Sequence, residues 1–250
     1  MSIKRYYIEL AYKGTNFHGW QIQPNAVTVQ QTLEKALSIK LQQDIKVVGA
    51  GRTDTGVHAK FFVAHFDSSK DIDDKTIFGL NNLLSNEIVV YKIKQVEPNF
   101  NARFDAVSRT YKYYIVNKKN PFIIETTTFV KDNIDVDLLN KASKILLNYS
   151  DFTSFSKLHT DTKTNNCKIM TARWFVENNI TVFEIKADRF LRNMVRSIVG
   201  TLLDVNIGKI NINDLKKIIE SKNRNKAGKS APAQGLFLTK IEYDNNIFII

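Results

Sequence analysis

The sequence has very little cysteine and histidine. Cys167 is its single cysteine, and its histidines are His18, His58, His65 and His159. One cysteine excludes an intrachain disulfide, which is typical of proteins from a reducing compartment. None of the histidines lies at metal-ligand spacing, and no cluster of acids and cysteines supports them, so the sequence disfavours a zinc site. We expect Cys167 to be inert, because no residue near it resembles an activating base.

Long apolar runs are also missing. No stretch of eighteen consecutive apolar residues occurs, and the chain opens on strand-like residues 4–10 without the apolar core of a signal peptide. Together with the single cysteine, these absences predict a cytoplasmic protein with no membrane segment.

The composition fits a folded protein with an excess of positive charge. Among the 250 residues, 43% are hydrophobic and 11% aromatic, which indicates a chain with a substantial core rather than a disordered one. Lysine and arginine number 36 against 25 acidic residues, giving a net charge of +11. Such a balance favours a polyanionic partner, most often a nucleic acid. A general lysine bias that serves solubility is the alternative explanation.

Hydrophobic periodicity predicts alternating strands and helices in the first half of the chain. Tyr6, Ile8 and Leu10 share one face of a strand, and Thr28 begins a capping-box sequence that is typical of a helix start. In chain order, the predicted elements are strand 5–12, helix 28–42, strands 45–50 and 60–67, helix 74–85 and strand 88–96.

The second half repeats the same β-α-β-β-α-β order without obvious sequence identity. In chain order, the predicted elements are strand 108–117, helix 137–148, strands 169–177 and 180–187, helices 188–205 and 212–221, and strand 235–243. The sequence therefore predicts an α+β protein of two pseudo-symmetric, ferredoxin-like or RRM-like halves, residues 1–104 and 105–250. We expect a central basic cleft between the two sheets, since domain interfaces are common binding sites.

One glycine-rich stretch, residues 49–59, concentrates the candidate chemistry. Its glycines permit tight backbone geometry around a single carboxylate, Asp54, and Arg52 lies two positions before it. In an extended segment these two side chains point the same way, and the arginine favours the ionised carboxylate. A nucleophile or a general base fits this pattern better than a general acid or a metal ligand, because no second acid is near. The alternative is a structural Arg–Asp ion pair.

Further candidates for RNA contacts lie in the second half. Tyr111 can stack on a base, whereas Tyr113 on the same predicted strand face is more typical of a core residue. Arg189, Arg192 and Arg196 fall at i, i+3 and i+7 of the predicted helix 188–205 and would form one basic stripe. The stripe, like the basic loops 117–121, 156–168 and 222–230, either contacts phosphates or is a solvated surface.

In these stretches and several others, the chain resembles the tRNA pseudouridine synthase A (TruA) family. The matching motifs follow family order over nearly the whole chain: residues 12–21 (YKGTNFHGWQ), 28–30 (TVQ), 49–59 (GAGRTDTGVHA), 108–113 (SRTYKY), 151–155 (DFTSF), 193–196 (NMVR) and 231–236 (APAQGL). A single match would be weak, but seven in order are highly specific. The sequence departs from the family pattern at Thr55 and at Lys60-Phe61, and neither change touches Asp54.

The resemblance implies an activity and roles for particular residues. Members of the family convert uridines 38, 39 and 40 of the tRNA anticodon stem-loop to pseudouridine, without a cofactor and as homodimers. By the same resemblance, Asp54 is the catalytic aspartate, Tyr111 contacts the target base, Arg52 helps to hold the flipped nucleotide and Arg196 pairs with the aspartate.

Two other functions compete with uridine isomerisation. A non-catalytic RNA-binding protein lacks support, because no RNP-type aromatic pattern appears in the sequence. A carboxylate glycosidase needs two acids about 5–10 Å apart, and the glycine-rich stretch offers only Asp54.

Overall fold

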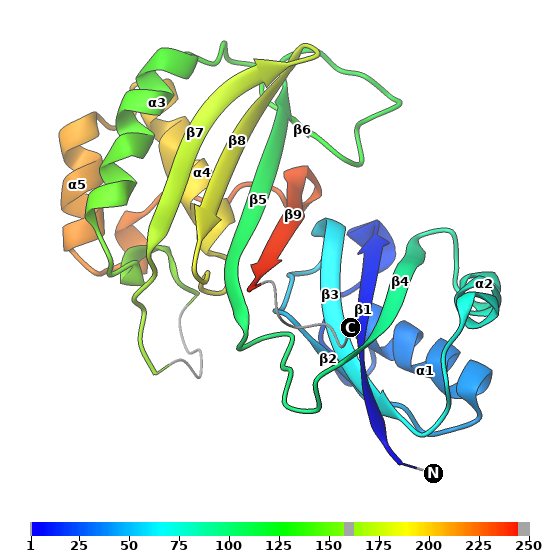
Figure 1. Ribbon diagram of the computed structural model, residues 1–250. Helices are drawn as coiled ribbons and strands as arrows, with labels where there is room; N and C mark the ends of the chain where they lie inside the picture. Colours follow the sequence, from blue (N-terminus) through cyan, green and yellow to red (C-terminus); the bar gives the residue numbers. More distant parts are fainter. Residues whose placement is uncertain (1, 158–162, 245–250) are drawn as a thin grey trace. The chain divides into compact units, whose positions relative to one another are not determined.

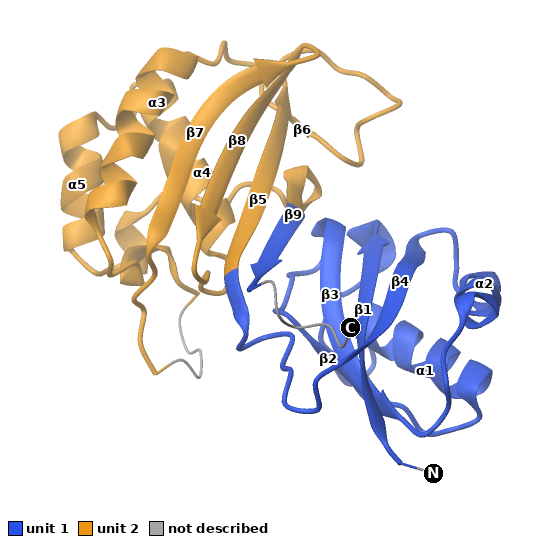
Figure 2. Cartoon of the chain, viewed as in Figure 1, with its two compact units in different colours: residues 1–107, 238–250 blue, residues 108–237 orange. Residues whose placement is uncertain are grey.

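The computed structural model describes residues 2–157 and 163–244, and the chain divides into two compact units (Figure 2). Unit 1 contains residues 1–107 and 238–250, and unit 2 contains residues 108–237. These limits differ from the expected halves, 1–104 and 105–250, chiefly because residues 238–244 belong to unit 1. Tyr243 packs within unit 1: its ring lies 5.5 Å from that of Phe100, and its hydroxyl donates to the Ala102 carbonyl at 2.6 Å.

Unit 1 is built on an antiparallel sheet in which β1 lies between β3 and β4. The short strand β2 and the strand β9 both adjoin β3 on the side away from β1, and helices α1 and α2 contact one another (Figure 1). Because β1 is central, Ile8 and Leu10 are fully buried. The elements are β1 (Lys4–Tyr12), α1 (Val29–Leu41), β2 (Val47–Gly49), β3 (His58–Ser68), α2 (Asp74–Leu83), β4 (Ile88–Val96) and β9 (Leu236–Tyr243).

Unit 2 pairs β8 antiparallel with both β5 and β7, and α3, α4 and α5 gather on one side of these strands (Figure 1). Asn178 and Asn179 join β7 to β8 with φ angles of 50° and 62°, as a two-residue hairpin turn requires. The elements are β5 (Ala106–Val116), β6 (Thr128–Phe129), α3 (Val136–Lys144), β7 (Ile169–Glu177), β8 (Ile180–Ala187), α4 (Met194–Asn206) and α5 (Ile212–Glu220).

Short 3₁₀ helices complete the described structure at residues 14–16, 145–148, 153–155, 224–226 and 233–235. The α+β class and the β-α-β-β-α-β order along each half are confirmed. The sequence did not predict β6, whose two residues are too few to show a period. None of the helices in residues 2–157 and 163–244 has the length and apolar character needed to span a bilayer.

The predicted helix over residues 188–205 was wrong at its start, because α4 begins only at Met194. The Asp188 side chain accepts from the backbone N–H of Arg189, and its carbonyl accepts from Arg109 rather than from a following helical turn. Asn193 then adopts a left-handed conformation with φ of 64°. Arg189 and Arg192 therefore precede the helix, and the predicted basic stripe with Arg196 does not exist as one helix face.

The segment that leaves unit 1 after β4 is held against the strands of that unit. Arg5 donates to the Phe100 carbonyl at 3.0 Å, and His65 Nδ1 accepts the Ala102 N–H at 3.1 Å. Burial, reinforced by the charge of Arg5, lowers the pKa of His65 to about 4. His65 is therefore neutral near pH 7, which is the state that leaves Nδ1 able to accept a hydrogen bond.

Candidate active site

The loop that carries Asp54 connects β2 to β3 in unit 1. It begins where the Ala50 N–H donates to the Val63 carbonyl at 2.8 Å, and it ends in a turn closed by a 3.1 Å bond from the Val57 N–H to the Asp54 carbonyl. Asp54 itself is partly buried. The glycine-rich stretch therefore does what its composition predicts: it places one carboxylate in a tight, hydrogen-bonded turn.

Residues 12–20 form the wall behind this loop. The Trp20 N–H donates to the Thr53 carbonyl at 3.2 Å, and the Gly56 N–H donates to the Phe17 carbonyl at 3.3 Å. The Thr53 hydroxyl also shares a buried 2.9 Å hydrogen bond with the hydroxyl of Tyr12. The backbone is thus fixed on both sides of Asp54, so the position of the carboxylate does not depend on its own side-chain contacts alone.

Gly19 is required where the wall meets the loop. Its φ of 82° lies in the left-handed region, and a Cβ there would stand 2.4 Å from the Thr53 carbonyl oxygen and 3.2 Å from the carbonyl carbon of Asp54. Any other residue at position 19 would strain its own backbone and push the loop away. The wall was part of the family resemblance, but its contribution to the geometry around Asp54 was not predicted.

Arg52 lies on the same loop with an exposed side chain. Its Nε donates to Oε1 of Gln21 at 3.2 Å, so one end of the guanidinium is tied to the segment that follows the wall. Arg52 and Asp54, two of the predicted site residues, therefore lie in the same loop of unit 1, between β2 and β3.

The other two predicted site residues belong to unit 2. The ring of Tyr111 on β5 is partly buried and stands edge-on to Phe190, with ring centroids 5.1 Å apart. Tyr113, two residues further along, is fully buried, and its hydroxyl donates to the Pro232 carbonyl at 2.8 Å. Tyr113 is therefore a core residue, whereas Tyr111 is only partly buried.

Arg196 in the first turn of α4 is fixed by the segment before β9. Its Nε donates to the Ala231 carbonyl at 2.7 Å, and the Ala231 N–H donates back to the Arg196 carbonyl at 2.9 Å. The preceding residue, Ser230, accepts from Asn193 at 2.6 Å and from Arg224 at 2.9 Å. The motif residues 193–196 and 231–236, far apart in sequence, are thus one hydrogen-bonded group in unit 2.

The basic loop 222–230 is less uniform than its sequence indicates. Lys222 forms an ion pair with Asp151 at 3.0 Å, and Arg224 also donates to the carbonyls of residues 227 and 228. Burial lowers the pKa of Arg224, which marks it as a partly desolvated, structural cation. Lys226 and Lys229 are exposed. In the basic loop 156–168, residues 158–162, His159 included, lie outside the described residues.

Cys167 is buried in surroundings that disfavour its reactive thiolate form. Burial raises the pKa of the Cys167 thiol to about 12, so it stays protonated near neutral pH. Within the described part of the chain, no group of three or more histidine, cysteine, aspartate or glutamate residues is arranged to hold a metal ion.

Comparisons with known proteins agree with these motifs. A family model described as tRNA pseudouridine synthase matches residues 10–105 and 142–244, which include Arg52, Asp54 and Arg196. A tRNA pseudouridine synthase A of Bacteroides fragilis is 55% identical over 99% of this chain and 100% of its own length. The protein of the same name from Parabacteroides distasonis is 53% identical over 98% of each chain. That of Acetivibrio thermocellus is 39% identical over 94% of this chain and 97% of its own.

The Gly19→Ala substitution should loosen the Asp54 loop. The added Cβ overlaps the Thr53 carbonyl, so we expect the amides of Trp20 and Val57, which close the loop, to exchange with deuterium at least about tenfold faster. Hydrogen–deuterium exchange with peptide resolution measures this change.

Gly208→Ala is the matched control. Gly208 also has a left-handed φ, of 70°, but a Cβ there meets no atom within 4 Å. It should cost only the backbone strain of about 1–2 kcal/mol and leave the loop amides unchanged. Equal exchange in the two variants would contradict the steric role of Gly19.

Proposed function

The chain belongs to the tRNA pseudouridine synthase family, and on that premise we propose that it isomerises uridines 38, 39 and 40 of the tRNA anticodon stem-loop. Conversion of uridine to pseudouridine in tRNA is the activity that the family name describes. The specific nucleotides follow from the resemblance of the seven ordered motifs to the TruA family. We further propose Asp54 as the catalytic residue, and its fixed place in the loop is the observation that carries this proposal.

The reaction needs one well-placed carboxylate rather than a pair. The N1–C1′ glycosidic bond of uridine breaks, the uracil rotates and C5 bonds to C1′, while C5 loses a proton and N1 gains one. No water, phosphate or electron enters or leaves. The Asp54 side chain serves any of three routes: attack on the uracil ring, attack on C1′, or removal of the C2′ proton.

The remaining predicted site residues take supporting roles in the proposal. Tyr111 contacts the target base through its aromatic ring or its hydroxyl, a role that its partial exposure supports. Arg52 helps to hold the flipped nucleotide, and Arg196 pairs with the catalytic carboxylate. The contact of Arg52 with Gln21 supports its role, because it holds one end of the guanidinium in place, and the role of Arg196 follows from the family resemblance.

Binding of tRNA supplies the free energy to expose the target base. Flipping a base out of a stem typically costs a few kcal/mol, and phosphate contacts by a basic surface offset that cost. The net charge of +11 supports this role. By family resemblance we also propose a cytoplasmic homodimer that needs no cofactor; a solution mass near that of one 28.7 kDa chain by light scattering would refute the dimer.

Asp54→Asn should abolish pseudouridine formation while tRNA still binds. The amide keeps the size of the side chain but removes the nucleophile or base, so we expect a rate loss of at least about a thousandfold. Binding should stay within about tenfold, because phosphate contacts dominate affinity. Carbodiimide-based mapping of pseudouridine in treated tRNA measures the product, and filter binding measures the affinity.

Asp71→Asn is the control for this experiment. Asp71 is an aspartate of the same unit with 84% of its side chain exposed, and its variant should retain the wild-type rate. Normal turnover by the Asp54 variant would refute the catalytic role. Tight binding without any product from the wild-type protein would instead favour the non-catalytic RNA-binding function.

Lys226→Ala should weaken tRNA binding and reduce its salt dependence. If the exposed Lys226 ammonium contacts one phosphate, the slope of log affinity against log salt concentration should fall by about one unit. Lys222→Ala is the matched control in the same loop, because the charge of Lys222 is already balanced by Asp151. Equal slopes for the Lys226 variant and the wild type would identify Lys226 as a solvated surface residue.

A further inference from the structure

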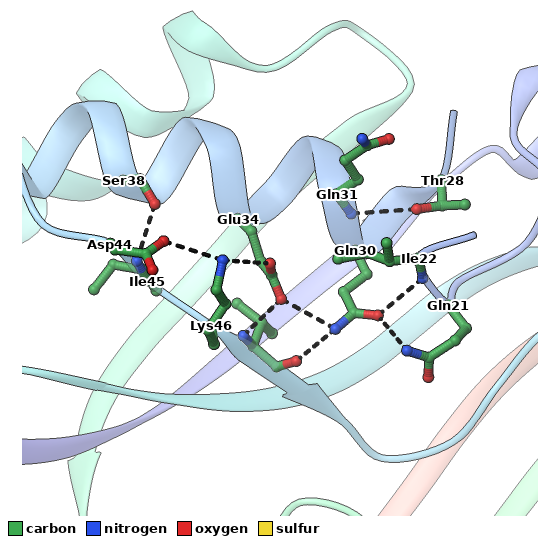
Figure 3. A network of polar contacts seen from close by, with 11 residues as sticks. Gln21, Ile22, Thr28, Gln30, Gln31, Glu34, Ser38, Asp44, Ile45 and Lys46 are labelled. Atoms are coloured by element: carbon green, nitrogen blue, oxygen red, sulfur yellow. Dashed lines mark hydrogen bonds and ion pairs between the residues drawn. The ribbon is translucent and has the colours of Figure 1, made fainter. Parts of the chain in front are cut away.

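A buried carboxylate in unit 1 has no part in the chemistry proposed above. Glu34 on α1 is only 7% exposed, and its Oε1 accepts from the Val47 N–H at 2.9 Å and from Nε2 of Gln30 at 3.0 Å (Figure 3). Lys46 is 3.9 Å from its other oxygen. Gln30 and Glu34 lie one helical turn apart on the same face of α1, so the Glu34 carboxylate can accept a hydrogen bond from the Gln30 side chain.

The surroundings of Gln30 fix which way its amide group points. Its NH₂ faces two acceptors, Oε1 of Glu34 and the Val47 carbonyl, at 3.0 and 2.9 Å. Its oxygen faces two donors, the Ile22 N–H at 3.1 Å and Nε2 of Gln21 at 3.0 Å. All four hydrogen-bonding positions of the amide are therefore used (Figure 3). A reversed amide would set like groups against each other on both sides.

The orientation of the Gln30 amide also determines the orientation of the Gln21 amide, which contacts Arg52. Since the Gln21 NH₂ donates to Gln30, its Oε1 is turned outward, where it accepts from Nε of Arg52 at 3.2 Å. An acceptor at this place holds the guanidinium, whereas an NH₂ group would repel it. The series Glu34, Gln30, Gln21 and Arg52 thus runs from the buried helix face to the loop that carries Asp54.

We propose that Glu34, Gln30 and Gln21 are positioning residues that orient the Arg52 guanidinium for the target nucleotide. This inference rests on the proposed role of Arg52 in uridine isomerisation. The same contacts also attach α1 to β2, so a purely structural role is the alternative. The two roles differ in one consequence. Only if these residues position Arg52 does the rate loss from substituting Gln30 or Gln21 depend on the presence of Arg52.

A double-mutant cycle with Arg52 separates these roles. Gln21→Met and Gln30→Met keep the side-chain volume and remove the hydrogen bonds, and each should lower the single-turnover rate by about three- to tenfold with little change in tRNA affinity. In the Arg52→Ala background, the same substitutions should cost less than about twofold. Equal losses in both backgrounds would overturn the positioning role.

Two further variants control for loss of stability. Gln31→Met makes the same change at the neighbouring helix position, where only the backbone N–H bonds to Thr28, and it should leave the rate unchanged (Figure 3). Glu34→Gln keeps the accepting oxygen and should retain most activity, whereas Glu34→Met should resemble Gln30→Met. A loss from Gln31→Met as large as that from Gln30→Met would overturn the inference.

A spectroscopic measurement tests the series without relying on activity. The Arg52 Nε–H signal in a ¹⁵N spectrum of the intact protein is identified by its loss in Arg52→Lys. We expect it to shift in Gln21→Met and Gln30→Met but not in Gln31→Met, and an unchanged signal in the first two would overturn the inference. If the signal shifts but Arg52→Ala leaves turnover intact, the proposed role of Arg52 fails, and the positioning role fails with it. If the wild type makes no pseudouridine, the proposed function itself fails.

Discussion

The backbone contact between residues 17–20 and 53–56 is the constraint on which the candidate site depends. Two main-chain hydrogen bonds and the Tyr12–Thr53 hydroxyl pair hold the chain on both sides of Asp54. The close approach is possible only because Gly19 lacks a Cβ. Main-chain bonds restrain a loop more tightly than a flexible side-chain ion pair, and a reaction that needs its base or nucleophile aligned benefits from that restraint.

The fold was largely predictable from the sequence because burial imposes a period on each element. Ile8 and Leu10 alternate along a central strand, and the predicted strand 88–96 matches β4 at both ends. Prediction failed where contacts from distant parts of the chain decide the local conformation. The start of α4 is set by Asp188 bonding to Arg109 and by the left-handed Asn193, and neither effect has a periodic signature.

The site was predictable only in part, for a similar reason. The spacing of Arg52 and Asp54 is local, so the sequence alone indicated that pair as candidates. Tyr111 and Arg196 were candidates as well, but only the family resemblance gave them particular roles. The series from Glu34 to Gln21 could not be read from the sequence, because polar residues on a helix usually indicate a solvated face. Only the buried position of Glu34, beside the main chain of Val47, turns those residues into a directed set of hydrogen bonds.

The positive charges of residues 222–230 also could not be interpreted from composition alone, because their contribution depends on where each cation lies in the structure. A count of lysines and arginines treats residues 222–230 as one phosphate-binding loop, yet its cations have different partners. Lys222 is balanced by Asp151, and Arg224 is committed to backbone carbonyls and Ser230. A cation already paired within the protein releases few counterions when RNA binds, so it adds little to the salt dependence. The electrostatic part of tRNA binding therefore depends on where exposed cations such as Lys226 and Lys229 stand, and the formal charge of +11 sets only its sign.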